Sequence, residues 1–391
     1  MVTAKGAQRL RRGSPWCYRT ELASPPDTAE RGAVVQVVDP QRNFIGQAFY
    51  AQRSPLALRL LTRVRPQDEA IDDLFFKVRL ERSLRRRSAL VGRDAYRWVH
   101  GEADGLPGLF VDRYGAGLTL QTLSEGAEVR KELFARLLLE LSERSFQVSH
   151  LAIRDDGSGR DFEGLERERR LLRGESPARV AFHEGRNRFE IDLIEDMKTG
   201  SFLDQVDNHL RAGELASGSG TALDLFSYHG GFALALAERC SQVIAVEQDP
   251  RAAARIRENA LRNQRSNVEA LEGNAFDVLK QHDEAKRRFD TIVVDPPGLA
   301  KRKHGLETAL RAYRELNLRA IRCLRPDGLL VTCSCSGKVS LEDFQRTVLA
   351  AAHDAKRTVQ LIERRGAGID HPVLPVLAES EYLKALFCRV L

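Results

Sequence analysis

The stretch Leu223-Asp-Leu-Phe-Ser-Tyr-His-Gly-Gly-Phe232 decides the fold. Its apolar run ends in an acidic residue and a glycine pair, which is typical of a parallel strand that turns into a helix. Similar runs follow at Val243–Asp249, before Asn274-Ala-Phe276, and at Thr291–Gly298. The carboxyl ends of parallel strands share one edge of a sheet, so these runs together predict a nucleoside-binding half-site.

The order of the predicted elements indicates three domains. Strand–helix alternation over residues 181–391 predicts a doubly wound, Rossmann-like α/β domain. Residues 1–75 contain short alternating runs broken by Gly and Pro, which predict a small, mostly β domain. A helix over residues 68–87 leads into a central α+β domain over residues 76–180, in which residues 163–173 are expected to form a charged surface segment.

Basic residues are clustered along a chain of 391 residues whose formal net charge is only +6. The clusters are Arg9, Arg11, Arg12 and Arg19; Arg82, Arg85, Arg86 and Arg87; and Lys301-Arg-Lys303. The second cluster alone is more typical of a solvated helix face. The three together favour a polyanionic partner, and RNA is the expected one.

The six cysteines form no CxxC pair and no disulfide-like spacing, and no His-rich segment accompanies Cys333-Ser-Cys335. We therefore expect neither a disulfide framework nor a bound metal. The sequence contains no apolar leader and no run of eighteen apolar residues, so a cytoplasmic location is expected.

The predicted strand ends offer groups suited to a nucleoside cofactor that carries a methionine-like tail. Asp224 can order the first turn or meet an ammonium group, and Gly230-Gly231 allows the backbone to approach a ligand closely. Glu247 can accept both ribose hydroxyls, and Asn274 and Phe276 suit adenine. The expected cofactor contacts at these strand ends are Asp224, Phe226, Tyr228, Gly230, Gly231, Glu247, Asn274, Phe276, Asp295 and Pro296.

Dinucleotide-binding dehydrogenases also place an acidic residue after the second strand. Their first turn usually carries G-x-G-x-x-G, which is absent here, as is a phosphate-binding Walker loop. The pattern therefore favours S-adenosylmethionine as the cofactor.

Two loops supply candidate catalytic groups. Asp295-Pro-Pro297 follows the fourth strand, and its prolines stiffen a loop that can face a planar base. Cys335 follows the fifth strand and can act as a nucleophile, whereas Cys333 is expected to pack inside. A thiol with a reference pKa of about 8.5 needs help to ionise, which the helix capped by Ser340 or the charge of Lys338 can give. The other cysteines are expected to be structural.

The chain resembles the bacterial class I methyltransferases that form 5-methylcytidine in 23S ribosomal RNA. Ala4-Lys-Gly-Ala-Gln-Arg-Leu10 with Trp16 resembles the start of their N-terminal PUA domain, and Val99–Asp112 their central-domain signature. Met197–Gln205 is similar to their K-T-G-x-x-L-D-Q motif. The resemblance covers nearly the whole chain, including Asp295-Pro-Pro297 and Ser334-Cys-Ser336.

The resemblance implies a PUA-like RNA-binding domain, a central α+β domain and a class I methyltransferase domain that uses S-adenosylmethionine. It further implies that Lys198, Thr199 and Gln205 line the cofactor pocket and that Cys335 is the nucleophile. Lys5, Arg9 and Arg19, with Lys301 and Lys303 of the third basic cluster, are the expected RNA contacts. Val206 and Gly298 depart from the family pattern, which usually has Arg and a larger residue there.

The implied reaction is addition of the Cys335 thiolate to C6 of a cytosine, followed by methylation at C5, with Asp295 stabilising charge at N3. The expected partner is 23S ribosomal RNA, free or in an assembling large subunit, and a homodimer stays open. Two other functions also stay open: methylation of a guanine or adenine nitrogen, and a non-catalytic RNA-binding assembly factor.

Overall fold

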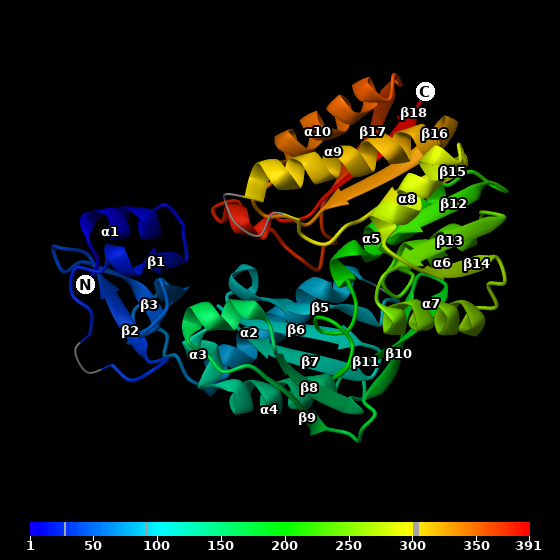
Figure 1. The fold of residues 1–391 in the computed structure, drawn as a ribbon. Helices are drawn as coiled ribbons and strands as arrows, with labels where there is room; N and C mark the ends of the chain where they lie inside the picture. Colours follow the sequence, from blue (N-terminus) through cyan, green and yellow to red (C-terminus); the bar gives the residue numbers. More distant parts are fainter. Residues whose placement is uncertain (27–28, 91, 300–304) are drawn as a thin grey trace. The chain divides into compact units, whose positions relative to one another are not determined.

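The computed structural model describes residues 1–26, 29–90, 92–299 and 305–391. It divides into two compact units (Figure 1). The first unit comprises Met1–His183, Glu190–Leu203 and Asp370–Leu377, and the second comprises Glu184–Phe189, Asp204–Ile369 and Ala378–Leu391. The helices in these ranges do not combine the length and the apolar composition of a membrane-spanning segment.

The N-terminal part of the first unit is a small antiparallel sheet, as the alternating apolar runs predict. Its strand order is β1-β4-β3-β2, and the strands are β1 (Trp16–Tyr18), β2 (Val34–Val38), β3 (Phe44–Tyr50) and β4 (Leu56–Thr62). Helix α1 (Ala4–Arg11) begins after Thr3, whose hydroxyl accepts a hydrogen bond from the Gly6 amide. Its Ala7 and Leu10 join the core of this sheet.

The rest of the first unit is α+β. Its sheet has the order β5-β6-β7-β8-β9, and the strands are β5 (Ala95–His100), β6 (Leu109–Tyr114), β7 (Gly117–Thr122), β8 (His150–Asp155) and β9 (Glu168–Arg173). Helices α2 (Asp73–Arg86), α3 (Glu125–Glu128) and α4 (Lys131–Ser142) pack with this sheet. Their apolar side chains share one core with the sheet, including Phe76, Phe134 and Leu120.

One expectation for this region was incomplete and another was wrong. The segment expected as a charged surface stretch is largely exposed, but it also contains β9, which pairs antiparallel with β8 at the edge of the sheet. An edge strand is partly solvated on both faces, so its charged residues do not show the apolar alternation of an inner strand. The Arg82–Arg87 cluster is not wholly solvated either, because Arg87 is buried and forms two hydrogen bonds with Asp104, at 2.7 and 2.8 Å.

A hairpin of β10 (Arg179–Glu184) and β11 (Asn187–Asp192) precedes the predicted Rossmann-like sheet. The sheet of the second unit has the order β14-β13-β12-β15-β16-β18-β17. Strands β12 to β16 are parallel, and β18 runs antiparallel to β16 and β17. The strands are β12 (Thr221–Leu225), β13 (Gln242–Glu247), β14 (Val268–Glu272), β15 (Phe289–Val294), β16 (Leu324–Ser334), β17 (Val359–Arg365) and β18 (Lys384–Val390).

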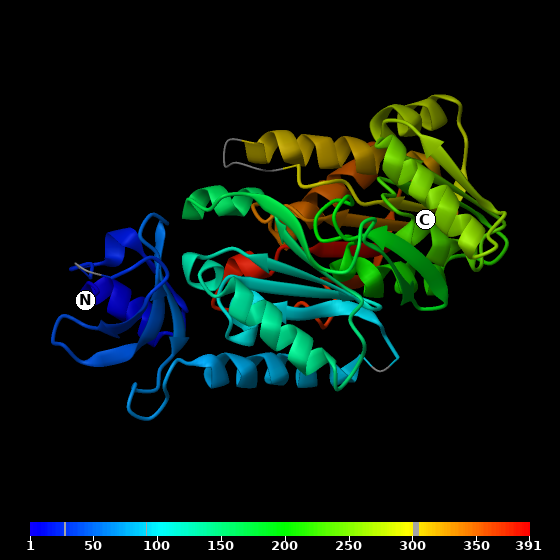
Figure 2. The same cartoon turned by 90° about the horizontal axis from the view of Figure 1, so that it is seen from below.

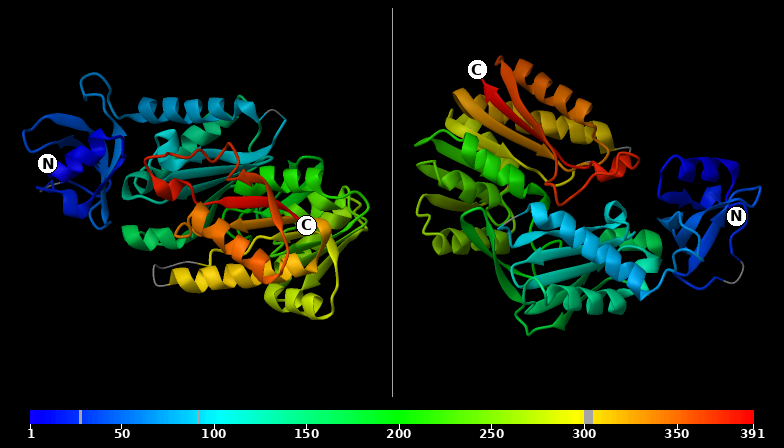
Figure 3. Two further views of the ribbon diagram at one scale, coloured as in Figure 1. Left: turned by 90° about the horizontal axis from the view of Figure 1, so that it is seen from above. Right: turned by 180° about the vertical axis from the view of Figure 1, so that it is seen from behind.

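Helices cover both faces of this sheet, which explains why its strands read as continuous apolar runs. Helices α8 (Ala275–Glu284), α9 (Leu306–Cys323) and α10 (Leu341–Asp354) contribute to the core on one face. Helices α5 (Val206–Leu215), α6 (Gly231–Ala237) and α7 (Pro250–Arg262) contribute to the core on the other. Figures 2 and 3 show this layering from further directions. The expected α/β fold class is confirmed.

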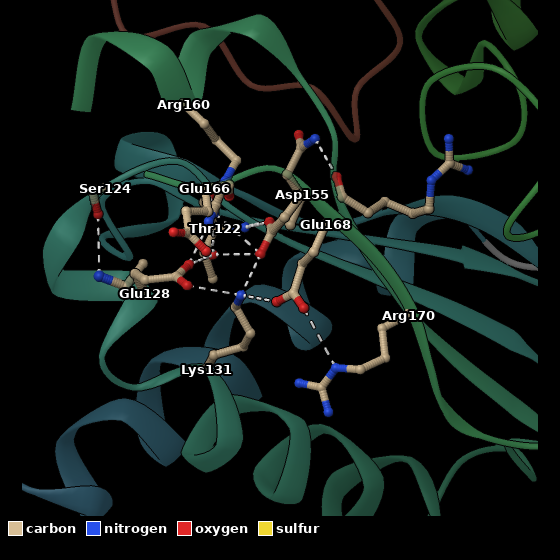
Figure 4. Close-up of polar contacts among 12 residues, drawn as sticks. Thr122, Ser124, Glu128, Lys131, Asp155, Arg160, Glu166, Glu168 and Arg170 are labelled. Carbon is tan, nitrogen blue, oxygen red and sulfur yellow. Dashed lines mark hydrogen bonds and ion pairs between the residues drawn. The ribbon is translucent and has the colours of Figure 1, made fainter. Parts of the chain in front are cut away.

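A buried ion cluster joins the sheet and α4 in the first unit (Figure 4). The Lys131 ammonium lies 2.9 Å from Glu128, 2.6 Å from Asp155 and 2.6 Å from Glu168. The Arg160 guanidinium lies 2.9 Å from Glu128 and 3.1 Å from Asp155. These carboxylates are close enough together to hold a metal ion, but the two basic side chains already supply the compensating charge.

We predict that Lys131→Met lowers the free energy of unfolding by about 3 kcal/mol, because it removes one of the two cations that compensate the buried Asp155 carboxylate. Lys77→Met is the matched control, since the Lys77–Glu140 pair is solvent-exposed in part and worth about 0–1 kcal/mol. Urea denaturation of both variants measures the difference. Equal destabilisation would show that the cluster contributes no more than a surface ion pair.

Candidate functional site

The carboxyl ends of the parallel strands bring the predicted site residues of the second unit to one edge. Val246 of β13 lies opposite Leu225 of β12, and Val294 of β15 lies opposite both Leu225 and Thr332 of β16. The loops that follow these strands therefore start side by side. They carry Phe226, Gln248, Asp295 and Cys335 within a few residues of the strand ends.

The turn between β12 and α6 has a strained backbone. Phe226 has φ 65°, Tyr228 has φ 51° and Gly230 has φ 87°. Left-handed conformations cost a non-glycine residue free energy, and such positions gather at ligand-binding sites. The Tyr228 amide donates to Glu247 Oε2 at 2.8 Å, which ties this turn to the end of β13.

Asp224 and His209 lie buried beneath this turn. The Ser227 hydroxyl donates to Asp224 Oδ2 at 2.5 Å, yet burial raises the pKa of Asp224 to about 7. Burial would lower the pKa of His209, but Glu184, whose Oε2 lies 2.8 Å from Nδ1, outweighs it and the pKa is raised. The pairing with Glu184 thus favours the protonated form of His209, and Asp295 and Asp224 act in the same direction.

The glycine pair has structural reasons that differ from the expected one. Gly230 adopts a left-handed conformation, which a side chain rarely tolerates. A Cβ atom on Gly231 would overlap the His209 ring. Close approach of a ligand is therefore not needed to explain Gly231, because the packing of α5 against α6 already requires it.

Glu247 has fewer open acceptor positions than the sequence suggested. Its Oε1 accepts from the amides of Gln248 at 2.7 Å and Asp249 at 2.9 Å, and its Oε2 accepts from Tyr228. A carboxylate offers about four lone-pair positions, so one remains for a ribose hydroxyl in this arrangement.

The expected adenine contacts lie after β14. Asn274 caps α8 by accepting from the Phe276 amide at 2.9 Å, which leaves its amide nitrogen to donate to a ligand. The rings of Phe276 and Phe226 meet edge to face with centroids 5.9 Å apart. These rings provide an apolar surface of the kind that a planar base packs against.

Gln205 contacts Asp295 and heads a chain of hydrogen bonds. Its amide nitrogen donates to Asp295 Oδ2 at 2.9 Å, and Asn208 Nδ2 donates to Gln205 Oε1 at 2.6 Å. Arg365 Nε donates to Asn208 Oδ1 at 3.0 Å. Gln205 and Asn208 are both buried, so their amides are fixed in direction and the Gln205 donor points at Asp295.

Cys335 lies beside the Asp295-Pro-Pro297 loop. Its Sγ is 3.9 Å from the Pro296 carbonyl oxygen, and a Cβ atom on Gly298 would lie 3.8 Å from the same Sγ. The absence of a side chain at Gly298 therefore keeps one approach to the thiol open. All six cysteines belong to the described residues; Cys335 is partly exposed and the other five are buried.

Burial separates the two neighbouring cysteines. It raises the pKa of Cys333 far above the usual range, so this thiol stays protonated. The loop of Cys335 is fixed by Tyr313, whose hydroxyl accepts from Ser334 at 2.9 Å and lies 3.1 Å from the Ser336 hydroxyl. The next residues lead to α10, which Ser340 caps as expected.

Other predicted site residues lie elsewhere. Lys198 and Thr199 belong to the first unit, where the Thr199 hydroxyl donates to Asp112 Oδ2 at 2.6 Å. Val206 is buried at the start of α5. Their contribution to a cofactor pocket stays a prediction.

The expected RNA contacts of the N-terminal domain differ in exposure and in whether their charged groups already have partners within the protein. The Arg9 guanidinium pairs with Glu21 at 2.9 Å, and Arg19 donates to the backbone carbonyls of Ser54 and Ala51. Lys5 is exposed. Lys301 and Lys303 lie outside the described residues.

Sequence reasoning missed His209, Asn208, Tyr313 and Lys384. Asn208 and His209 could have been found from the sequence, because they follow Gln205, the N-cap residue of α5, by three and four positions and so lie on the same side of the helix. Tyr313 and Lys384 could not be predicted from local sequence. Tyr313 contacts the Cys335 loop because α9 packs against the sheet, and Lys384 contacts it because β18 pairs with β16.

Comparisons with known proteins concern the domains and the fold. A family described as a PUA-like domain matches residues 1–63, and one described as conserved hypothetical protein 95 matches residues 208–360. Two solved structures share the fold over 100% of this chain: a methyltransferase complexed with S-adenosylhomocysteine (TM-score 0.84, 19% identity, 99% of that chain) and a SAM-dependent methyltransferase from Streptococcus mutans (TM-score 0.81, 18% identity, 100% of that chain).

A curated relative is closer in sequence. The ribosomal RNA large subunit methyltransferase I of Yersinia pestis is 35% identical over 399 residues, which span 100% of this chain and 99% of the relative. The chain therefore belongs to the ribosomal RNA large subunit methyltransferase I family.

Proposed function

We propose that this protein methylates large-subunit ribosomal RNA at carbon C5 of a cytosine, with S-adenosylmethionine as the methyl donor. Family membership supports the substrate class and the cofactor. The observation that carries the choice of base is the partly exposed Cys335 beside Asp295-Pro-Pro297. A purine nitrogen needs no such nucleophile, whereas C5 of cytosine does.

The residues present fit this cofactor. The open acceptor position on Glu247 suits a ribose hydroxyl. The amide nitrogen of Asn274 can donate to a ring nitrogen of adenine, and the strained turn at Phe226 and Tyr228 is of the kind found at ligand-binding sites. When bound, the cofactor supplies an electrophilic methyl group. Lys198, Thr199 and Pro296 are the remaining proposed contacts, and Asp224 is proposed to order the turn from below.

Cys335 would supply the activation that C5 lacks. Its thiolate attacks C6, the S–C6 bond forms, and the electron pair of the C5=C6 bond becomes available at C5 as in an enamine. After C5 has accepted the methyl group, a base removes the C5 proton, the C5=C6 bond forms again and Sγ leaves as a thiolate. Cys335 is therefore regenerated in every turnover.

Asp295 would share a proton with N3 of the bound cytosine, because addition of the thiolate to C6 pushes electrons toward N3 and that proton keeps negative charge from building up on the base. A group that is already oriented costs no reorganisation when the charge appears, and this is the largest source of catalysis in many enzymes. The chain from Arg365 through Asn208 and Gln205 provides that orientation. Gln205 thus acts as a positioning residue for Asp295 as well as a proposed cofactor contact.

We predict that Cys335→Ala abolishes formation of 5-methylcytidine while cofactor binding stays nearly unchanged, because only the nucleophile is lost. The assay combines transcribed 23S ribosomal RNA, methyl-labelled S-adenosylmethionine and identification of the labelled nucleoside by mass spectrometry. Cys333→Ala is the matched control and should retain turnover. A labelled purine would refute C5 methylation, and full activity of Cys335→Ala would refute the nucleophile.

Gln205→Met should lower the single-turnover methylation rate about 10- to 100-fold. It removes a hydrogen bond to a charged group, which is worth about 1.5–3 kcal/mol, and keeps the side-chain volume. Gln360→Met is the control for the same chemical change at an exposed position of β17. An unchanged rate in Gln205→Met would mean that Asp295 needs no orienting partner.

A further inference from the structure

A lysine is buried next to the Cys335 loop. Lys384 begins β18, lies opposite Ser334 of β16 in the strand register, and is only 5% exposed. Its ammonium donates to the Ser336 carbonyl at 2.8 Å and to the Tyr382 carbonyl at 2.7 Å. The first of these bonds places the charge against the residue that follows Cys335.

Transfer of a charge out of water is costly, so a buried ammonium either loses its proton or is stabilised by a compensating anion. Both hydrogen bonds of Lys384 go to backbone carbonyls, and no carboxylate within the described ranges forms an ion pair with it. The acidic groups whose charge acts on it are Cys335 and Glu381. Glu381 is exposed, so water screens it, and Cys335 is the anion that the buried ammonium can hold.

The other charges around Cys335 make a cation more necessary. Asp295 faces the same loop, and its negative charge opposes a thiolate. Tyr313 contributes no charge, because burial raises the pKa of its hydroxyl, and Cys333 stays protonated for the same reason. Lys338, which the sequence suggested as the cation, is exposed.

We propose that Lys384 is the counter-ion that holds Cys335 as a thiolate, ready to attack, before RNA binds. This inference rests on the proposed function, in which Cys335 is the nucleophile. The thiol proton passes to water, the ammonium keeps its three protons, and no other bond changes. The positive end of α10, which starts shortly after Cys335, adds to the same effect.

The ionisation of Lys384 itself is consistent with this role. Burial lowers the pKa of Lys384 to about 8, and the neighbouring Cys335 opposes that shift. Lys384 is therefore still mostly protonated at neutral pH, where the thiolate has to be present. Above that pKa the ammonium loses its charge, but a thiol with an ordinary pKa of about 8.5 also begins to ionise in this range.

Alkylation of Cys335 by iodoacetamide as a function of pH tests this proposal in the full chain, without RNA or cofactor. Mass spectrometry of the Cys335 peptide gives the rate. Lys384→Met should shift the half-maximal rate upward by about one pH unit or more and slow alkylation at pH 7 about tenfold, since one pKa unit is a tenfold change in thiolate fraction. Lys384→Arg should restore most of the rate.

Two further variants keep the test decisive. Lys384→Gln retains a donor for the carbonyls of Ser336 and Tyr382, so it serves if Lys384→Met does not fold, and thermal unfolding checks both. Lys338→Met tests the exposed alternative and should shift the profile less. Profiles that coincide for the wild type and the uncharged Lys384 variants would overturn the proposal, as would a larger shift in Lys338→Met.

This experiment is independent of the identity of the methylated base. A labelled purine product would remove the proposed function and still leave the alkylation profile to report on the Lys384–Cys335 pair. Conversely, a 5-methylcytidine product with an unshifted profile would keep the function and remove the role of Lys384.

Discussion

The pairing of β15 with β16 is the interaction on which the site depends. Val294 lies opposite Thr332, so the chain leaves both strands at the same level, with Asp295 after one and the Cys335 loop after the other. Buried apolar side chains on both faces of the sheet fix that register, because a slip of one residue would turn every side chain to the opposite face. The core therefore determines how far the thiol lies from the carboxylate.

Around this edge several charged or polar side chains have partners that are fixed in direction. His209 lies against Glu184, Gln205 donates to the half-buried Asp295, and Lys384 donates to the carbonyl of Ser336. Charges held in this way at a partly buried site act more strongly on one another than in water and need not reorganise during a reaction. This arrangement would let one small site hold a nucleophile, a charge-stabilising carboxyl group and a cation together.

Much of the fold and part of the site could be predicted from the sequence, for a physical reason. Asp224, Glu247, Asp295 and Cys335 each follow an apolar run within the same short segment, so local pattern and the rule for parallel strand ends were sufficient. The contact between Gln205 and Asp295 spans 90 positions of the chain, and that between Lys384 and Ser336 spans 48. Such contacts depend on helix and strand packing, which local pattern does not reveal. Strand β9 was missed because its charged residues resemble a surface loop. Gly231 was expected to make room for a ligand, because the sequence does not show that the His209 ring, from another helix, packs against it.

The most direct test of the proposed reaction is to trap the bond between Cys335 and the base. 23S ribosomal RNA transcribed with 5-fluorocytidine carries fluorine at C5, which a base cannot remove as a proton, so Sγ cannot leave after methyl transfer. We predict a complex that survives denaturing gel electrophoresis, requires S-adenosylmethionine and gives a nucleotide adduct on the Cys335 peptide. Absence of any such complex from protein that is active on ordinary RNA, or an adduct on another residue, would contradict the proposed reaction.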